Sequence, residues 1–312
     1  MKVLLTGAAG FIGSHVAERL ATRGDEVVGL DNFDSFYDRA IKEKNLASFA
    51  ERIDLVEGDI RDPELVDRVF AQGGFDAVVH LAALAGVRPS IEKPWRYPEV
   101  NIVGTSRLAE AMVRYDVKRL VFASSSSVYG DNAEVPYRED HRVDLPASPY
   151  AASKRGAELL LRSFHGVHGL TVSCLRYFTV YGPRQRPEMA IHKFCRLVDE
   201  EKPIPMFGAG DTSRDYTFID DIVAGTLGAL DRAPEGFSIY NLGNTQPITL
   251  RDLITAIGVA VGKEPIVEQL PLQPGDVLRT WADVSAAARD LGYAPRVPLE
   301  EGLRRFVAWM RG

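Results

Sequence analysis

Thr6-Gly7-Ala8-Ala9-Gly10-Phe11-Ile12-Gly13 is the stretch that decides the fold, and it completes the apolar run Val3–Thr6. Its three glycines permit a tight turn between a strand and a helix, and they let backbone N–H groups approach a bound pyrophosphate. The N-terminus of the following helix adds partial positive charge at the same place. Glycine-rich turns are common, so the surrounding sequence has to decide the interpretation.

The first half of the chain alternates short apolar runs with helical patterns. Fully apolar strands that alternate with helices are typical of a parallel sheet covered on both faces. Crossovers between such strands are right-handed, so we expect an α/β fold with a doubly wound parallel sheet of the Rossmann type. The expected strands are Val3–Thr6, Glu26–Leu30, Ile53–Glu57, Ala77–Leu81, Leu120–Ser124 and Val172–Arg176, and the expected helices are Ile12–Arg23, Pro63–Phe70, Asn101–Arg114 and Pro149–Phe164.

The regular alternation of strands and helices ends after Arg176, where proline and glycine cluster in four short segments. We expect residues 1–176 to form the dinucleotide-binding domain. Residues 177–312 are expected to form mainly a smaller, loop-rich substrate region, from which strands or helices can return to the first domain. A cleft between the two parts is the expected ligand site. The helical patterns in the second region are Ala190–Glu200, Asp220–Leu230 and Leu250–Val261.

Composition excludes several classes of function. The chain has 312 residues and a net charge of −6, so no overall positive field attracts nucleic acid or an anionic membrane. We find no apolar run near the roughly 20 residues of a membrane span. The two cysteines and six histidines show no metal-ligand spacing, so neither a metal site nor a disulfide is expected, and a cytoplasmic location is the default.

An acidic residue stands where a dinucleotide-binding unit needs one. Asp31 ends the second expected strand, 18 residues after Gly13, where its carboxylate can accept hydrogen bonds from both ribose hydroxyls of an adenosine. Asn32 and Phe33 follow rather than arginine, which disfavours a 2′-phosphate and predicts NAD rather than NADP. The predicted cofactor residues are Gly7, Gly10, Phe11, Ile12, Gly13, Asp31, Asn32, Asp59, Ile60, Leu81, Ala82, Ala83, Tyr150 and Lys154.

Tyr150-Ala151-Ala152-Ser153-Lys154 is the candidate catalytic motif. Positions i and i+4 share a helix face, so both long side chains can reach one site. A neighbouring ammonium and an oxidised nicotinamide favour the phenolate of a tyrosine, which makes Tyr150 a candidate base. The serine run Ser124–Ser127 ends the preceding strand and offers a hydroxyl for the reacting oxygen.

These motifs together resemble the extended short-chain dehydrogenase/reductase family. The resemblance continues through Arg176–Pro183 and Arg214-Asp215-Tyr216 to nearly the whole chain, and its closest branch is the sugar-nucleotide epimerases and dehydratases. It implies that Tyr150 is the catalytic base, that Lys154 holds the nicotinamide ribose, and that Ser125 supplies the catalytic hydroxyl. It also implies that Arg214 contacts the substrate diphosphate, that Asp276 contacts the uridine ribose, and that the chain forms a homodimer.

The serine run indicates which reaction of that branch the chain catalyses. Ser126 and Ser127 stand where the dehydratases carry an Asp-Glu pair, and the UDP-glucuronate decarboxylases have a glutamate at the second position. Epimerisation needs only the tyrosine, a hydroxyl and NAD. We therefore expect a UDP-sugar 4-epimerase: Tyr150 takes the 4-hydroxyl proton, the C4 hydride passes to tightly bound NAD, and the hydride returns to the other face of a transient 4-keto sugar.

The sugar itself is predicted from weaker signals. Ala85–Ser90, Thr179 and Arg186–Ala190 resemble UDP-glucuronate 4-epimerases, whereas UDP-glucose/UDP-galactose 4-epimerases usually carry asparagine at the Thr179 position and often arginine at that of Gln273. The neutral-hexose epimerase is the alternative, followed by a UDP-glucuronate decarboxylase and a non-catalytic NAD-sensing scaffold. The predicted substrate-binding residues are Arg88, Ser125, Ser126, Ser127, Thr179, Arg184, Arg186, Met189, Arg214 and Asp276.

Overall fold

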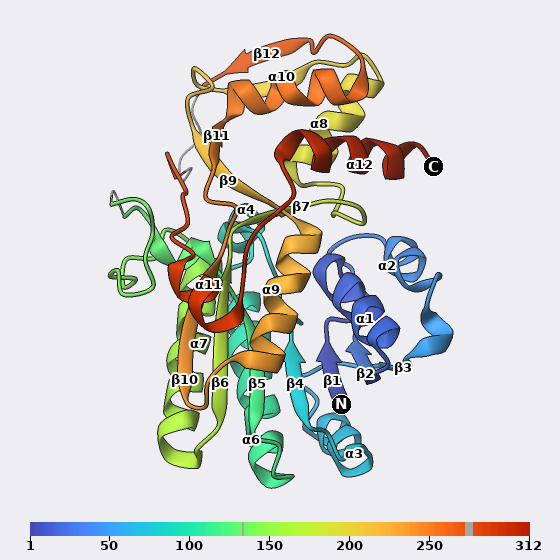
Figure 1. The fold of residues 1–312 in the computed structure, drawn as a ribbon, viewed down its shortest axis with the longest axis vertical. Helices are drawn as coiled ribbons and strands as arrows, with labels where there is room; N and C mark the ends of the chain where they lie inside the picture. Colours follow the sequence, from blue (N-terminus) through green and yellow to red (C-terminus); the bar gives the residue numbers. More distant parts are fainter. Residues whose placement is uncertain (133, 272–276) are drawn as a thin grey trace.

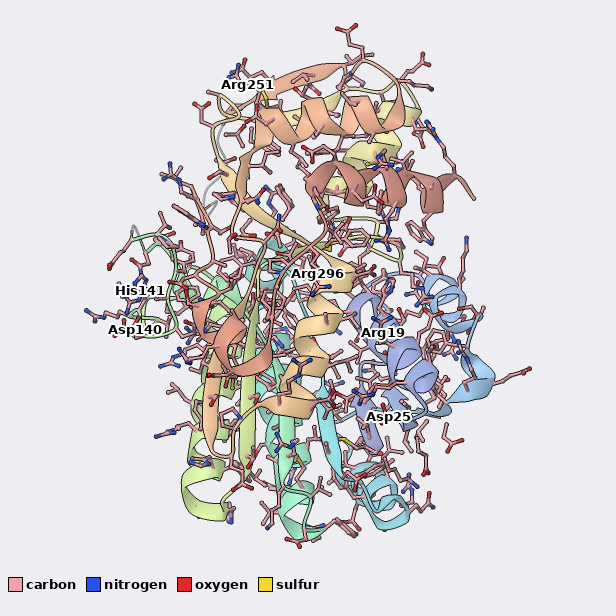
Figure 2. The ribbon with its side chains drawn as sticks, in the orientation of Figure 1. Arg19, Asp25, Asp140, His141, Arg251 and Arg296 are labelled. Atoms are coloured by element: carbon pink, nitrogen blue, oxygen red, sulfur yellow. The ribbon has the colours of Figure 1, made fainter. Side chains whose placement is uncertain are left out.

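A parallel sheet with helices on both faces carries a smaller unit at the carboxyl ends of its strands (Figure 1). The computed structural model describes residues 1–132, 134–271 and 277–312. Within these residues, no helix is long and apolar enough to cross a membrane. Figure 2 places Asp25 in the sheet layer and Arg251 in the smaller unit, with Asp140 and His141 on the segment that projects sideways before α7.

Seven strands form the sheet, and every neighbouring pair in it is parallel. This is the doubly wound topology that the alternating pattern predicted, with the central crossover between β1 and β4. The strands, in spatial order, are β10 (Phe237–Leu242), β6 (Thr171–Tyr177), β5 (Arg119–Ser125), β4 (Ala77–His80), β1 (Lys2–Thr6), β2 (Glu26–Asp31) and β3 (Asp54–Glu57).

The two faces of the sheet carry separate hydrophobic cores. On one face, α1 and α9 pack over residues such as Val3 and Leu5, and on the other, α3, α6 and α7 pack over residues such as Leu4. Alternation of the side chains along β1 produces this division. The elements of this layer are α1 (Phe11–Arg23), α2 (Arg39–Leu46), η1 (Ala50–Arg52), α3 (Pro63–Gly73), α4 (Val87–Glu92), α5 (Arg96–Pro98), η2 (Glu99–Gly104), α6 (Thr105–Arg114), η3 (Ser126–Tyr129), α7 (Pro149–His168), α9 (Ile219–Arg232) and α11 (Ser285–Leu291).

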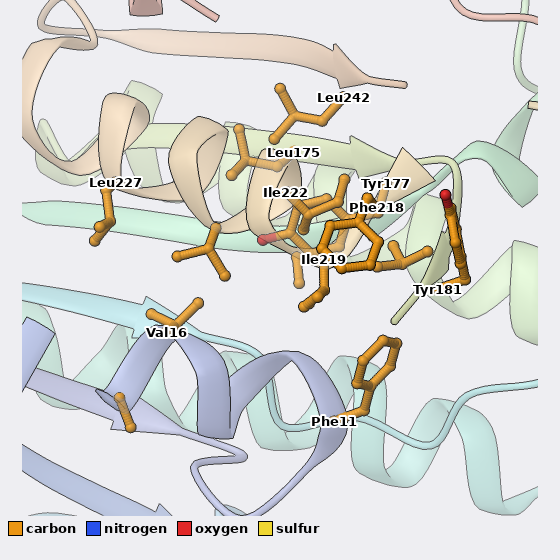
Figure 3. Packing of buried hydrophobic residues seen from close by; sticks show 14 of the residues in the cluster. Phe11, Val16, Leu175, Tyr177, Tyr181, Phe218, Ile219, Ile222, Leu227 and Leu242 are labelled. Atoms are coloured by element: carbon orange, nitrogen blue, oxygen red, sulfur yellow. The ribbon is translucent and has the colours of Figure 1, made fainter. Parts of the chain in front are cut away.

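Helix α9 is part of the sheet layer although it follows residue 176. Figure 3 shows its side chains Ile219, Ile222 and Leu227 packed between the strands and Val16 of α1. The next strand, β10, pairs with the outer edge of β6. Residues 219–242 and 285–291 therefore extend the sheet layer, a return of the chain that the sequence left open.

The smaller unit is built from the remaining segments of the second half. Strand β9 pairs with β7 in parallel and with β11 in antiparallel orientation, and β8 pairs with β12. The helical patterns expected after Arg176 are found as α8, α9 and α10, whereas the short strands gave no apolar run to predict them. Its elements are β7 (Thr179–Tyr181), α8 (Ala190–Asp199), β8 (Ile204–Phe207), β9 (Ser213–Phe218), β11 (Pro247–Thr249), α10 (Leu250–Val261), β12 (Val267–Leu270) and α12 (Leu299–Arg311).

Candidate active site

A cavity of about 390 Å³ lies at the carboxyl ends of the strands. Parallel α/β sheets place ligands at this edge, because the loops after the strands converge there. All the predicted cofactor residues and the three predicted catalytic residues line the cavity. Of the predicted substrate residues, Ser125, Ser126, Ser127, Thr179, Arg186 and Met189 line it.

The glycine turn forms one wall of the cavity and leaves no room for side chains. Gly7 has a φ of 73°, and a Cβ there would lie 2.7 Å from the backbone nitrogen of Ala82. A Cβ on Gly13 would lie 1.9 Å from the carbonyl oxygen of Gly7. Helix α1 begins directly after Gly10, whose N-cap position has no capping side chain. The turn therefore presents the start of a helix to the cavity, as binding of a pyrophosphate requires.

Asp31 is held in place by three donors. Its Oδ2 accepts from the Ala9 N–H at 3.0 Å, and its Oδ1 accepts from the Phe33 N–H at 2.8 Å and from Lys42 Nζ at 3.2 Å. From the sequence, Asp31 was expected to face the ribose with no cationic partner. The structure shows one, because a buried lysine from α2 forms an ion pair with it.

Asp59 lies at the same end of the cavity as Asp31. It accepts hydrogen bonds from Asn32 Nδ2 at 2.9 Å and from the Arg61 guanidinium. Burial acts to raise the pKa of Asp59, but these hydrogen bonds outweigh it and lower the pKa to about 2. Asp59 is therefore ionised at neutral pH and fixed in the cofactor end of the cavity.

Tyr150 enters the cavity from the first turn of α7. Ser148 caps that helix by accepting from the Ala151 N–H at 3.1 Å, and Pro149 occupies its first position. Burial raises the pKa of Tyr150, while a hydrogen bond with Ser125 and the Arg186 guanidinium act to lower it. Tyr150 and Ser125, the predicted base and the predicted catalytic hydroxyl, thus lie together at the start of α7.

Lys154 lies one turn further along the same helix face. Its Nζ donates to the carbonyl oxygen of Ala123, the last-but-two residue of β5, at 2.8 Å. Burial lowers the pKa of Lys154 to about 7, and the carboxylate of Glu158 opposes that shift. The shift toward phenolate expected from a neighbouring ammonium does not appear, because burial has the largest effect on the pKa of Tyr150.

Glu158 supports this face of α7, and the sequence analysis did not single it out. Its fully buried carboxylate accepts from Ser124 Oγ at 2.6 Å and from Arg176 Nε and Nη2 at 3.0 Å each. Arg155 donates to it at 2.9 Å. The spacing Tyr150, Lys154, Glu158 repeats every four residues, so the pattern that predicted the first pair also contained the third residue.

At the Tyr150 end of the cavity, Arg186 is the only arginine among the described residues that line it. Its guanidinium lies 5.3 Å from the ring centroid of Phe36, and its Nε lies 3.2 Å from a carboxylate oxygen of Glu188. Ser126, Ser127 and Thr179 provide hydroxyls nearby in the same lining. This end therefore combines one cation with several neutral hydrogen-bonding groups.

Four predicted substrate residues are not placed in this lining. Arg184 has a φ of 64°, and its side chain turns to Glu18 of α1, at 2.7 Å, and to the ring of Phe49. The guanidinium of Arg88 lies over the ring of Phe207, and Arg214 donates to the carbonyl oxygen of its neighbour Ser213. Asp276, like Gln273, lies outside the described residues.

Acidic, histidine and cysteine side chains give no sign of a metal centre. In the described part of the chain, no group of three or more of them is placed to hold a metal ion. Both cysteines, Cys174 and Cys195, are buried and free, and burial raises the pKa of each thiol. Neither cysteine lines the cavity.

A family model described as the NAD-dependent epimerase/dehydratase family matches residues 3–243. The chain belongs to that family. Members of the NAD-dependent epimerase/dehydratase family are enzymes that use NAD, and the cavity of this member fits the cofactor on independent grounds. A side chain on Gly7 or Gly13 would collide with backbone atoms, so only glycine lets this turn bring the start of α1 to the cavity. The buried hydroxyl of Tyr37, which lines the cavity, has no hydrogen-bond partner among the described residues.

Relatives of this epimerase/dehydratase cover its whole length. The UDP-glucuronate 4-epimerase of Thermodesulfobacterium geofontis is 44% identical over 311 residues, which are 99% of this chain and 95% of that protein. A UDP-glucuronic acid 4-epimerase from Bacillus cereus, solved in complex with UDP-glucuronic acid and NAD, is 36% identical with a TM-score of 0.93 over 100% of this chain and 99% of that chain. A UDP-glucose 4-epimerase from Thermotoga maritima, solved with UDP-glucose, is 34% identical with a TM-score of 0.92 and the same coverage.

Several residues that line the cavity of this family member belong to no recognisable motif, so they were not predicted from the sequence. Phe36, Tyr37 and Lys42, which follow β2, line the cavity. Leu84, after β4, and Val100, in η2, line it as well. Phe36 and Tyr150 pack against one small hydrophobic cluster around Leu84 and Val100, although they lie more than a hundred residues apart in sequence. Only the apolar character of Phe36 beside Asp31 offered a signal, and that signal is too common to interpret.

Proposed function

We propose that the chain is a UDP-glucuronate 4-epimerase, which inverts C4 of the sugar through a transient 4-keto intermediate while NAD stays bound. The observation that carries this proposal is the composition of the sugar end of the cavity, whose described lining has hydroxyls at Ser125–Ser127, a single arginine at Arg186 and no carboxylate. Relatives named as UDP-glucuronate 4-epimerases over nearly the whole chain support it.

The positions of the carboxylates in the cavity favour epimerisation over dehydration. Among the described lining residues, the acidic side chains are Asp31, Asp34 and Asp59, and all of them follow β2 or β3. Elimination of water needs an additional acid and base beside the sugar. Ser126 and Ser127 carry neutral hydroxyls, which are poor general acids and bases, so the site favours a reaction that needs only one proton acceptor.

Tyr150 is that proton acceptor in the proposed reaction. Its phenolate oxygen takes the proton of the sugar 4-hydroxyl, and Ser125 hydrogen-bonds the same substrate oxygen and holds it in line. Lys154, when protonated, stabilises the phenolate. Bound NAD would supply the acceptor and later the donor of the C4 hydride and, in its oxidised form, a positive charge beside Tyr150. Tyr150 then returns the proton after the keto sugar has turned over.

Arg186 explains why the acidic sugar is preferred over a neutral hexose. Its Nε already pairs with Glu188, and its remaining N–H groups, near the Tyr150 end of the cavity, can donate to a carboxylate at C6. A hydrogen bond to a charged group contributes roughly 1.5–3 kcal/mol. Arg88 and Arg184 were also predicted to bind the substrate, but Arg186 is the only arginine among the described residues of the lining. We therefore expect about a 10- to 100-fold preference for the acidic sugar, the effect of one hydrogen bond to a charged group.

A UDP-glucose/UDP-galactose 4-epimerase is the second candidate. The neutral hydroxyls of Ser124–Ser127 and Thr179 suit a neutral sugar as well as an acidic one, and the Thermotoga maritima relative was solved with UDP-glucose. The two candidates differ in one group of the substrate, the carboxylate at C6.

Comparison of kcat/KM for UDP-glucuronate and UDP-glucose tests the proposal. We expect the acidic sugar to be converted at least tenfold more efficiently, with the 4-epimer as the product and no added NAD required. Equal values, or a preference for UDP-glucose, would select the second candidate. Accumulation of a UDP-pentose with release of carbon dioxide would select a decarboxylase, and no turnover of either sugar would select the NAD-sensing scaffold.

Assembly as a homodimer and a cytoplasmic location complete the proposal. Helix α7 and the neighbouring η2 expose the apolar side chains Leu159 and Val103, which are 54% and 47% exposed. A second copy that packs against this face would cover them. Light scattering of the purified protein would detect the dimer, and Leu159→Glu should shift it toward monomer. The negative net charge gives no reason to expect a nucleic-acid partner.

A further inference from the structure

Lys42 is a buried lysine in the cavity to which neither the motifs nor the proposed reaction assigns a role. It lies on α2, its side chain is only 8% exposed, and its Nζ lies 3.2 Å from Asp31 Oδ1. That is the only hydrogen bond described for its ammonium group, which has three protons to donate. A buried lysine that lines a cavity with unused donors is placed to bind a ligand group there.

Tyr37 gives independent evidence that a ligand group is bound at this place. Its ring lies 5.3 Å from Lys42 Nζ, and its buried hydroxyl has no hydrogen-bond partner among the described residues. Leaving a buried hydroxyl unpaired is costly, so such an atom in a binding site usually meets a ligand or a water molecule. Both side chains line the cavity beside Asp31, where the adenosine ribose of NAD is expected.

The other charged groups around this subsite already have partners. Arg39 forms hydrogen bonds with Glu57 at 2.8 Å and 2.7 Å, and Arg61 pairs with Asp59. Asp34 pairs with Arg96, and Arg186, whose charge also acts on Tyr37, pairs with Glu188. The charge that faces the ribose 2′-position is therefore set by Asp31 and Lys42, which together are neutral.

We propose that Lys42 is a cofactor-binding residue that, together with Asp31, sets the choice between NAD and NADP. Lys42 donates to the adenosine ribose while Asp31 accepts from its hydroxyls. Because the ammonium offsets the carboxylate, repulsion of a 2′-phosphate is weaker than Asp31 alone would produce. The ion pair to Asp31 holds Lys42 away from a 2′-phosphate, and removal of that carboxylate would release the lysine to bind one.

Two substitutions should therefore change cofactor preference in opposite directions. Asp31→Asn leaves Lys42 as an unpaired cation, so the ratio of the Kd for NADP to that for NAD should fall by about 10- to 100-fold, the usual effect of a hydrogen bond to a charged group. Lys42→Met leaves a bare carboxylate, so the same ratio should rise by about tenfold or more. Tyr37→Phe should weaken both cofactors alike and leave the ratio unchanged.

The experiment measures cofactors rather than turnover. Each variant is purified as the full chain, its bound NAD and NADP are released by denaturation and quantified, and Kd values are measured by calorimetry on stripped protein. Lys44→Met is the matched control, because Lys44 is an exposed lysine of the same helix and does not line the cavity. Circular dichroism checks that each variant is folded, and Lys42→Gln replaces Lys42→Met if the latter does not fold.

The proposal rests on NAD being the resident cofactor of the proposed function, but not on the identity of the sugar. Opposite shifts for the Asp31 and Lys42 variants would support it. A Lys42→Met protein with the same NADP/NAD ratio as Lys44→Met would overturn it and reduce Lys42 to a structural partner of Asp31. If the unmodified chain bound no dinucleotide at all, the proposed function would fail instead, so the two failures are distinguishable.

Discussion

At the cofactor end of the cavity, the contacts depend on where backbone atoms lie, whereas at the sugar end they depend on which side chains follow the strands. Gly7 and Gly13 shape the first end through space that a Cβ would occupy. Ser127, Thr179 and Arg186 shape the second through hydroxyls and one guanidinium. A backbone-built site accepts one kind of ligand, because any change of shape disturbs the chain itself. A side-chain-built site changes its ligand by substitution, so the sugar end is where specificity is decided.

Tyr150→Phe should have the largest effect, and it tests whether chemistry can be lost while both ends stay intact. Removal of a positioned proton acceptor lowers turnover by about 10²–10⁴. The phenylalanine keeps the contact with the hydrophobic cluster, so NAD should remain bound at the level of the unmodified protein. Measurement of kcat together with the bound NAD per chain checks both parts. Near-normal turnover would remove Tyr150 from the mechanism.

Arg186→Met should alter the sugar end alone. We expect kcat/KM for UDP-glucuronate to fall by about 10- to 100-fold and that for UDP-glucose to change little, because only the acidic sugar loses a charged partner. Arg184→Met is the control, since Arg184 pairs with Glu18 outside the cavity and should affect both sugars alike. If the Arg186 variant weakened both sugars equally, its guanidinium would serve the common diphosphate instead.

Ser127→Glu adds a carboxylate to an end whose described lining residues include none. The new charge would repel the sugar carboxylate, so we expect kcat/KM for UDP-glucuronate to fall by roughly tenfold, with the content of bound NAD unchanged. It should not by itself create an efficient decarboxylase, although Ser127 is where such activity would be tuned. Chromatography of the UDP-sugar products detects any UDP-pentose. A substantial UDP-pentose yield from the unmodified enzyme would contradict this view of Ser127.

The smallest expected effect concerns a contact that joins the two parts of the molecule. His15 of α1 is hydrogen-bonded to the carbonyl oxygen of Pro183, just after β7, and burial lowers the pKa of His15 to about 4. Between pH 6.5 and pH 4 the unfolded chain binds a proton that the folded protein does not. The free energy of unfolding should therefore fall as the pH falls, by at most about 1.4 kcal/mol per pH unit from this group.

Urea unfolding at pH 6.5 and pH 4.5 measures that dependence. His15→Gln can keep a donor to the carbonyl oxygen but cannot titrate, so its stability should depend less on pH than that of the unmodified protein. His80, also buried and with its pKa lowered to about 3, is present in both proteins and cancels from the comparison. The same dependence in both proteins would show that His15 is not the titrating group.

The difference between the two ends also explains what could be predicted from the sequence. Strands, their parallel topology and the cofactor wall follow from local patterns, since Gly7, Gly10 and Gly13 report a backbone shape directly. Asp31 was placed correctly, but its partner Lys42 was missed, because the ion pair depends on how α2 folds back over β2. Arg184 was expected beside the sugar, but its left-handed backbone turns the side chain toward α1.

The return of β10 to the sheet has a consequence for any exchange of parts between members of the family. A fragment that ends at residue 176 would leave the outer edge of β6 without a neighbour and would remove α9 from one face of the sheet. Unpaired, apolar strand edges recruit other chains and aggregate. A chimera with a new sugar specificity must therefore keep residues 219–242 and 285–291 with the sheet and transplant other parts of the second half, above all the segment before residue 219 that carries Thr179 and Arg186.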